Sequence, residues 1–261
     1  MPDAPMPRPD ELRERLVGER SLFSVSELYH ENSKLSPVAP RIEQSAESLL
    51  AAPTGFKRYA NAPRIALPPI GHLPDAGLFQ TMAKRRSRRD FAASPLGLDT
   101  VAALLFHAAG TTDGRQLRIC PSAGGLYPLE TYLVAFNVGG LDAGLYHFDV
   151  RGFGLHQISR ADYRPQVLKA VYIPEALKHA SAVVVLSGVF GRSKIKYGER
   201  AYRFVLLEAG HAMQNLCLAA TALGIGACPV GGFVDDVLND LLDLDGVDEA
   251  PLYAAILGTS T

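Results

Sequence analysis

The segment Ala182–Val189 reads AVVVLSGV, an almost continuous run of apolar and β-branched residues. Such a run is typical of a strand that is buried on both faces of a sheet. The later segment from Arg200 to Leu223 is apolar on most sides, with Glu208 and His211 as a narrow polar stripe. A helix with so little polar surface lies at the centre of a fold or in a subunit interface. The two segments predict a buried sheet and a long helix that is central or interfacial.

The rest of a compact domain is predicted from Leu78 onward. Helices are expected over 98–109, where Gly110 can supply the positive φ that often ends a helix, and over 234–242. Further strands are expected over 131–138, 145–150, 154–158, 225–230 and 252–257, the second and third forming a hairpin. A chain of 261 residues with 48% hydrophobic content is large enough to give such a domain a real core.

Residues 1–75 differ from this pattern because prolines recur through them. Helical composition is limited to 11–17 and 42–52, and the sequence YHENSKLSP at 29–37 indicates an extended or turning link. We therefore expect an N-terminal arm of helical and irregular pieces over 1–75, followed by one domain over 76–261.

Composition argues against several classes of function. The 26 Lys and Arg against 27 Asp and Glu leave a net charge of -1, so no overall basic field favours nucleic acid or an anionic membrane. No apolar run reaches the roughly 18 residues that span a bilayer, and the first residues lack the order of a signal peptide, so we expect a cytoplasmic protein. The histidines and cysteines show no metal-binding spacing, and no metal site is expected. The thiols that we expect to be reduced and mostly buried are Cys120, Cys217 and Cys228.

A concentration of positive charge occurs at residues 84–91, which read KRRSRRDF. Arg85, Ser87 and Arg89 alternate, so in an extended segment their side chains fall on one face and can close on a single phosphate. A solvated basic surface is the alternative interpretation of such a charge run.

Two glycine-rich segments are candidates for contact with a flat or anionic ligand. The sequence PSAGGLYP at 121–128 lets backbone amides approach a ligand closely, although an ordinary turn has the same composition. The sequence GIGACPVGG at 224–232 is not a dinucleotide fingerprint, because it follows a helix and no helix opens at its last glycine. A strand end that lies along a flat ring remains open for this second segment.

A Lys-Tyr pair precedes the long apolar helix, where residues 196–204 read KYGERAYRF. An amine and a phenol held side by side can carry out proton chemistry. The alternative interpretation is a pair of partly exposed residues that cap the helix.

These segments, in this order and at these separations, resemble the FMN-dependent nitroreductase superfamily. The closer likeness is to its SagB-type branch, the azoline dehydrogenases that act on thiazoline- and oxazoline-containing peptides. The resemblance runs from about Tyr29 to Leu257 and is densest over 84–91, 121–134 and 196–233. It implies an α+β fold of the nitroreductase type, with a central, mainly antiparallel sheet wrapped by helices. It also implies a homodimer formed through the long helix, with FMN in each interface groove.

The resemblance gives each segment a role. Lys196 and Tyr197 match the K-Y-G-x-R-x-Y-R-F segment of the SagB-type branch and are the expected catalytic pair. Three other sets are expected to bind FMN. The phosphate is expected to be held by Arg85, Ser87 and Arg89. The segment expected to reach the flavin from the partner subunit is Pro121, Ser122, Gly124 and Gly125. The segment expected to run along the isoalloxazine ring is Pro229, Val230, Gly231 and Gly232.

Two family features have no counterpart in this sequence. Many members carry basic residues after the last strand, whereas residues 257–261 read LGTST, so phosphate binding is expected to rest mainly on 85–89. Nitroreductases often have an acidic residue near the P-x-x-G turn, where this chain has Val230-Gly231. Flavin contacts at that turn are therefore expected to come from backbone amides.

The resemblance implies that the chain oxidises azoline rings to azoles in a peptide natural-product pathway, with dioxygen as the final acceptor and a cyclodehydratase complex as a candidate partner. Three alternatives stay open. The first is an NAD(P)H-dependent flavin reductase of nitro compounds or quinones. The second is oxidation of another small molecule, one bound to a carrier in a nonribosomal or polyketide pathway. The third is a flavin-free scaffold subunit of a modifying complex.

Overall fold

The computed structural model describes residues 24–34, 56–112 and 117–261. The chain divides into two compact units, residues 1–41 and 42–261. The boundary expected at residue 75 stays a prediction, and the helical segments expected over 11–17 and 42–52 lie outside the described residues.

In the first unit, the described residues form helix α2 (Val25–Asn32). Ser24 caps it: the Ser24 hydroxyl accepts from the Glu27 amide, and the Glu27 carboxylate accepts from the Ser24 amide at 2.6 Å. The prediction of an extended link from residue 29 was therefore wrong for 29–32. The reason is the S-x-x-E capping box, which begins a helix just upstream of that segment.

In the described part of the second unit, the core is a seven-stranded sheet in the order β1-β4-β3-β2-β5-β7-β6, and every pairing between neighbours is antiparallel. This confirms the expected α+β fold with a central antiparallel sheet. The strands are β1 (Arg64–Ala66), β2 (Leu129–Ala135), β3 (Gly144–Asp149), β4 (Gly154–Arg160), β5 (Ala182–Val189), β6 (Ile225–Val230) and β7 (Glu249–Thr259).

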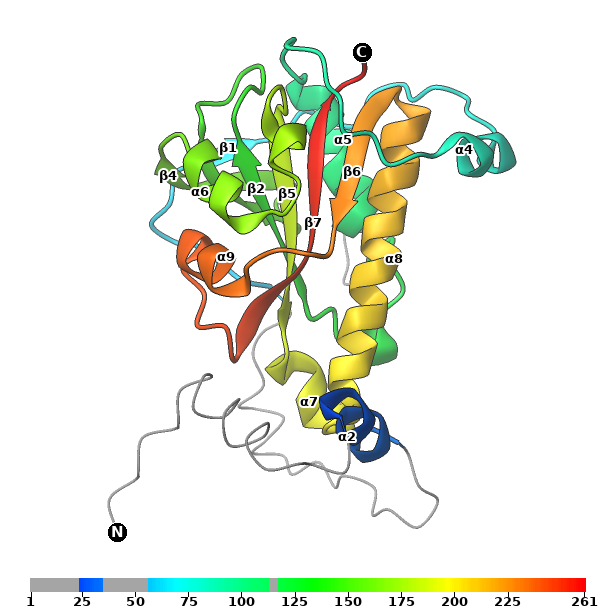
Figure 1. Cartoon of the computed structure of the whole chain (residues 1–261). Helices are drawn as coiled ribbons and strands as arrows, with labels where there is room; N and C mark the ends of the chain where they lie inside the picture. The colour runs from blue at the N-terminus through cyan, green and yellow to red at the C-terminus, as the bar shows by residue number, and fades with distance from the viewer. Residues whose placement is uncertain (1–23, 35–55, 113–116) are drawn as a thin grey trace. The chain divides into compact units, whose positions relative to one another are not determined.

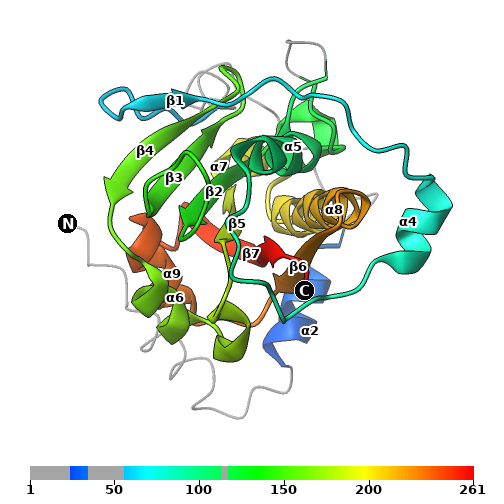
Figure 2. The same ribbon diagram turned by 90° about the horizontal axis from the view of Figure 1, so that it is seen from above.

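Helices cover both faces of this sheet, as Figures 1 and 2 show. One face is packed by α5 and α8, and the other by α6, α9 and a short 3-10 turn. The elements of these layers and their neighbours are α4 (Leu78–Lys84), α5 (Leu98–Ala109), η1 (Ala123–Gly125), α6 (Arg164–Ala170), η2 (Pro174–Leu177), α7 (Gly191–Tyr197), α8 (Arg200–Ala222) and α9 (Asp235–Leu242).

Strand β5 shows why the sequence produces this layered arrangement. Its side chains alternate between the two cores: Val184 and Leu186 pack in the core under α5 and α8, whereas Val183 and Val185 pack in the opposite one. Because both faces are covered, both sets of positions have to be apolar, and the run has no polar alternation. The prediction of a doubly buried strand over 182–189 is confirmed.

Helix α8 lies against the sheet with one face and leaves apolar side chains on the other. Val205 and Leu216 are buried in the core, while Leu206 and Leu207 are 40% and 55% exposed. The expected polar stripe is not continuous, because Glu208 is buried and His211 is exposed. Along the described parts of the chain, no helix combines the length and apolarity needed to cross a membrane.

Candidate active site

The Lys-Tyr pair ends helix α7, directly against the glycines of η1. Gly124 has a φ of +66°, and a Cβ atom placed on it would lie 2.5 Å from the Tyr197 hydroxyl and 2.8 Å from Lys196 Nζ. Real Cβ contacts are almost never shorter than 3.0 Å. The fold therefore brings together two segments that the sequence analysis had singled out separately, and it does so through a residue without a side chain.

Packing fixes the pair from the other side as well. The Tyr197 ring meets the Phe204 ring edge to face at 5.0 Å, and Lys196 Nζ lies 5.4 Å from the Tyr197 ring centroid. A cation near an aromatic face is attracted by the ring quadrupole. Tyr197 is half-buried and Lys196 is exposed in this chain, so the amine and the phenol are adjacent and accessible.

The loop that carries η1 is tied to helix α8. The Ser122 hydroxyl accepts from the Tyr127 amide at 2.9 Å, and the Cys120 thiol contacts the Glu208 carbonyl oxygen at 3.6 Å. Burial raises the pKa of the Glu208 carboxyl to about 7, against the opposing effects of a hydrogen bond with Ser122 and the charge of Arg118. Glu208 therefore changes its protonation state near neutral pH beside the loop.

The basic segment lies at the opposite end of α8. Arg85 ends helix α4, and the chain then runs along the sheet, where the Arg88 amide donates to the Ala227 carbonyl at 2.9 Å. Phe91 is buried against Gly226 and Gly258, where an added Cβ atom would come within 2.8 Å and 2.7 Å of its ring. Phe91 therefore anchors the segment to the ends of β6 and β7.

The arginines of this segment face α8 and β6. Burial raises the pKa of the Cys217 thiol on α8, and the positive charge of the nearby Arg85 acts to lower it. Burial likewise raises the pKa of the Cys228 thiol on β6, and the charge of the nearby Arg89 acts to lower it. Arg85 is half-buried, whereas Ser87 and Arg89 are exposed. These two guanidinium groups and the hydroxyl are suitable donors for a phosphate.

The strand end at Pro229–Gly232 offers bare backbone. Pro229 and Val230 belong to β6, and Gly231 and Gly232 follow it on the surface. A Cβ atom on Gly231 would meet Tyr253 at 3.8 Å, and one on Gly232 would meet Tyr172 at 3.6 Å, both ordinary contacts. An uncovered glycine backbone can support the flat ring of FMN, and the donors of the basic segment can hold its phosphate, so the residues present fit the cofactor.

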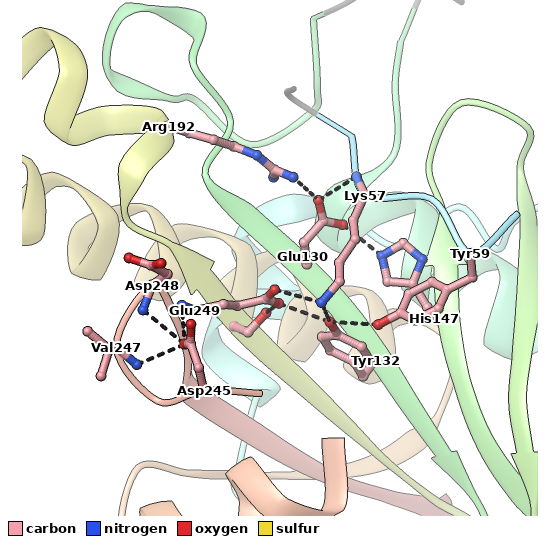
Figure 3. A network of polar contacts seen from close by, with 11 residues as sticks. Lys57, Tyr59, Glu130, Tyr132, His147, Arg192, Asp245, Val247, Asp248 and Glu249 are labelled. Atoms are coloured by element: carbon pink, nitrogen blue, oxygen red, sulfur yellow. Dashed lines mark hydrogen bonds and ion pairs between the residues drawn. The ribbon is translucent and has the colours of Figure 1, made fainter. Parts of the chain in front are cut away.

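A buried network of charged residues, which the sequence patterns did not predict, ties the start of α7 to the sheet (Figure 3). Glu130 on β2 accepts from Arg192 of α7 at 2.5 Å and is hydrogen-bonded to His147 at 2.7 Å. Burial alone would raise the pKa of Glu130, but the hydrogen bond with His147 and the charge of Arg192 lower it to about 2. The signal for this network was a glutamate inside the apolar strand LETYLVA.

The network continues to a second buried carboxylate. Glu249 at the start of β7 accepts from Lys57 Nζ at 2.7 Å, from the Tyr132 hydroxyl at 2.9 Å and from the Ser187 hydroxyl at 2.6 Å. These residues connect the neighbouring strands β2, β5 and β7, so the network ties them together near the end of β5 that leads into α7 (Figure 3). Among the described residues, no three His, Cys, Asp or Glu side chains are gathered as metal ligands would be.

Comparison with known proteins decides the family. The sequence model of the nitroreductase family matches residues 82–259, from the end of α4 to the end of β7. The chain belongs to the nitroreductase family. This confirms the resemblance drawn from the ordered motifs.

Three curated proteins show how this nitroreductase-family chain relates to others. It is 33% identical over 194 residues to a Methanocaldococcus jannaschii protein named as a nitroreductase, covering 74% of this chain and 95% of that protein. It is 30% identical over 232 residues to the trifolitoxin-processing protein TfxB of Rhizobium leguminosarum, and the match covers 79% of this chain and 60% of TfxB. It is 28% identical over 174 residues to the microcin B17-processing protein McbC of Escherichia coli, covering 62% of each. The chain thus spans less than two thirds of the two processing proteins.

Two solved structures share the fold. A protein of Anabaena variabilis described as a nitroreductase has a TM-score of 0.73 and 28% identity, and the match covers 90% of this chain and 46% of that one. A chain of the Escherichia coli microcin synthetase complex McbBCD, solved with truncated pro-MccB17 bound, has a TM-score of 0.60 and 21% identity. The match covers 97% of the present chain and 91% of that chain. The second likeness shows the fold alone.

Proposed function

We propose that this nitroreductase-family protein is an FMN-dependent oxidoreductase that dehydrogenates azoline rings to azoles in a peptide natural product. The observation that carries the proposal is the contact of Lys196 and Tyr197 with Gly124, which sets an amine and a phenol beside a glycine loop. Two relatives named for processing trifolitoxin and microcin B17 support a peptide substrate.

The reaction requires an acceptor for a hydride and an acceptor for a proton. FMN, when bound, would supply the hydride acceptor, with dioxygen as the expected final electron acceptor. Lys196 takes the proton from the ring carbon next to the one that loses hydride, so an azoline loses two hydrogens and becomes an azole. Tyr197 orients the ring and donates a hydrogen bond to charge that develops on it. The exposed position of Lys196 lets a substrate reach it.

The cofactor-binding residues follow from the same proposal. Arg85, Ser87 and Arg89 hold the FMN phosphate, and the backbone of Gly231 and Gly232 supports the ring. The wide separation between the basic segment and the Lys-Tyr pair along α8 calls for a second copy of the chain. Exposed apolar residues on α8 and α4 support a homodimer. They are Leu206, Leu207, Leu78, Phe79 and Met82.

The proposal also covers location and partners. We expect a cytoplasmic protein that works with a cyclodehydratase, the enzyme class that forms azoline rings from peptide side chains. A solved microcin synthetase complex that contains a chain of this fold supports an assembly of several subunits.

An NAD(P)H-dependent nitroreductase is the second candidate function. The Methanocaldococcus jannaschii protein named as a nitroreductase matches over 95% of its length, a more complete match than either processing protein gives. In this candidate, a nicotinamide reduces FMN and a nitro compound or quinone accepts the electrons.

Single-turnover reduction of the bound flavin distinguishes the two. Purified protein should be yellow, release FMN on denaturation, and lose its yellow colour anaerobically with a thiazoline peptide but not with NADPH. Lys196→Ala should keep FMN and slow this step by roughly 10²–10⁴-fold, the usual effect of losing a positioned base. Lys194→Ala, on the same helix, is the matched control and should be unaffected. Rapid bleaching by NADPH with no response to the azoline would replace the proposal with the second candidate.

Flavin binding is tested separately. Arg85→Ala with Arg89→Ala should empty the site, since each charge-assisted hydrogen bond contributes roughly 1.5–3 kcal/mol. Arg86→Ala with Arg88→Ala removes the same charge from the intervening positions and should retain FMN. Equal FMN content in the two double variants would show that the phosphate is bound elsewhere.

A further inference from the structure

We infer that two arginines, Arg58 and Arg151, form a binding site for an acidic segment of the peptide that this protein oxidises. The inference rests on the proposed function and names a feature of its substrate, namely carboxylates that lie a few residues away from the azoline ring. The site consists of two adjoining cavities, both of which are lined by Arg58 and Arg151. We call it the arginine groove.

The arginine groove is large enough for a segment of peptide. One cavity has a volume of about 720 Å³ and is also lined by Phe56, Val189 and Arg192. The other has a volume of about 510 Å³ and includes Gly152 of the turn between β3 and β4. Cavities of this size enclose ligands of many atoms rather than single ions. An extended ligand with more than one negative charge therefore fits the groove better than an isolated anion.

The charges of the groove are balanced within the chain except at the two arginines. Ion pairs account for every other Lys, Arg, Asp and Glu side chain that lines it. They are Lys57 with Glu249, Arg64 with Asp149, and Arg192 with Glu130, the first and last of which Figure 3 shows. Arg58 and Arg151 are exposed, and neither has a carboxylate partner among the described residues. Two positive charges are thus left for a ligand.

Packing prepares Arg151 for binding. Its guanidinium group lies 4.8 Å from the centroid of the Phe56 ring, which lines the same cavity. Attraction between the cation and the ring restricts a side chain that would otherwise move freely in water. Arg58 follows Phe56 by two positions, so one short segment supplies both the ring and the second guanidinium. Each guanidinium presents a planar fork of donors that matches the two oxygens of a carboxylate.

The larger cavity lies at the start of the helix that ends with the Lys-Tyr pair. Arg192, in the first turn of α7, lines this cavity and also donates to the Tyr127 carbonyl at 3.3 Å. Tyr127 belongs to the glycine-rich segment that contacts the pair. Lys196 follows Arg192 by four residues, a rise of about 6 Å along a helix. We therefore expect a peptide that reaches Lys196 with its azoline to place neighbouring residues in the groove.

A peptide-binding assay tests the groove without any turnover. The probes are two fluorescein-labelled peptides, one with four consecutive glutamates and one with glutamines in their place. Purified wild-type protein should bind the glutamate peptide more tightly by roughly tenfold or more, because charge-assisted hydrogen bonds are the strong ones. Raising NaCl from 50 to 500 mM should remove most of this preference, since exposed charges are screened by salt.

Paired variants assign the preference to the two arginines. Arg58→Ala with Arg151→Ala should abolish it, and Arg58→Glu with Arg151→Glu should reverse it in favour of a lysine peptide. Arg160→Ala with Lys169→Ala removes the same charge from exposed positions outside the groove and should keep the wild-type preference. A preference for glutamate that survives in the first double variant, or an equal loss in the control, would overturn the inference.

Inorganic phosphate distinguishes an acidic peptide from a small anion. At 1 mM phosphate and constant ionic strength, the glutamate peptide should stay bound, because one phosphate cannot occupy both cavities. Displacement of the peptide by phosphate at this concentration would overturn the inference and assign the arginines to a small phosphate-bearing ligand.

Single-turnover flavin reduction connects the groove to the proposed reaction. Thiazoline peptides with glutamates at increasing distances from the ring are compared with their glutamine counterparts. At the favoured distance, the glutamate peptide should reach half-saturation at a lower concentration, with the same limiting rate, and Arg58→Ala with Arg151→Ala should lose only this advantage. An effect on the limiting rate alone would contradict a binding role for the arginines.

The proposed function and the inference fail in different ways. Thiazoline peptides that never reduce the flavin would overturn the proposed function, even if glutamate binding still depended on the two arginines. Thiazoline peptides that reduce the flavin equally well with glutamate and with glutamine at every distance would leave the proposed function intact and overturn the inference alone.

Discussion

Gly124 stands directly against Tyr197: a Cβ atom at position 124 would lie 2.5 Å from the phenol oxygen. The same atom would lie 2.8 Å from Lys196 Nζ. Gly125 has nearly the same φ, +67° against +66°, but nothing lies within 4 Å of its would-be Cβ. Both glycines therefore have the left-handed backbone conformation, but only Gly124 has side chains packed against the position of a Cβ atom.

Gly124→Ala should cost much more activity than Gly125→Ala. Both variants place an L side chain in the left-handed region, which costs roughly 1–2 kcal/mol. Only Gly124→Ala also pushes against Lys196 and Tyr197, so turnover should fall by at least tenfold in that variant alone. Thermal unfolding and single-turnover flavin reduction measure the two effects separately. Equal loss of turnover in both variants would mean that the contact at Gly124 does not position the pair.

Glu208 should make the stability of the protein depend on pH. Burial raises its pKa in the folded chain from the ordinary value of 4.5 to about 7. Between these values the unfolded chain loses the proton and the folded chain keeps it, so stability falls as pH rises from about 4.5 to 7. The full loss is about 3 kcal/mol, since one pKa unit corresponds to about 1.4 kcal/mol.

Glu208→Gln keeps the shape of the side chain and removes the titration. The variant should match wild type at pH 5 and be more stable than wild type at pH 8, by denaturant unfolding at both values. If the difference in unfolding free energy between wild type and Glu208→Gln were the same at pH 5 and pH 8, the raised pKa of Glu208 would be contradicted.

Glu130→Ala should be strongly destabilising because it strands a buried cation. Arg192 and Glu130 are 4% and 2% exposed, and removing one partner of a buried ion pair costs about 3–5 kcal/mol. Asp142→Ala is the control, because its pair with Arg160 is exposed and should contribute less than about 1 kcal/mol. Urea unfolding of both variants measures the difference. A similar, small loss in both would mean that Arg192 finds another partner when Glu130 is absent.

Phe91→Ala should weaken flavin binding without touching a proposed flavin ligand. The ring is 4% exposed and fills the space above Gly226 and Gly258, so its removal should cost about 3–5 kcal/mol of stability. It should also release the basic segment from the sheet and lower FMN occupancy. Val247→Ala, at a side chain that is 66% exposed, is the control for both measurements. Full FMN occupancy in folded Phe91→Ala protein would show that the segment is held in place by its backbone hydrogen bonds alone.

Hydrophobic pattern was sufficient to predict most of the sheet. The strands over 182–189 and 225–230 and the helix over 98–109 have the predicted bounds, because each is a long apolar pattern that ends at a clear signal. The last strand is longer than predicted, from Glu249 to Thr259, since its first residues are polar or proline and carry no strand signal.

Polar residues inside the core were beyond the reach of such patterns. Glu130 lies 62 positions from Arg192, and Tyr132 lies 117 positions from Glu249, so neither partner can be inferred from local sequence. The same holds for the candidate site. The motifs at 84–91, 121–128 and 196–204 could each be recognised, but which of them touch depends on how α7 and η1 fold against each other. The roles of these residues stay predictions.

The hydrogen bonds that seat the basic segment also set when it can form during synthesis. The Thr259 hydroxyl donates to the Ala92 carbonyl, 167 positions earlier in the chain. The Arg88 amide donates to the Ala227 carbonyl, which is also synthesised much later than Arg88. Bringing together residues so far apart in the chain costs conformational entropy. The pairing of the last strand, β7, with its neighbours is needed to offset that cost. Before β7 has emerged from the ribosome, the basic segment therefore has no partner in that strand, and we expect a cofactor to bind there only after the whole sheet has formed.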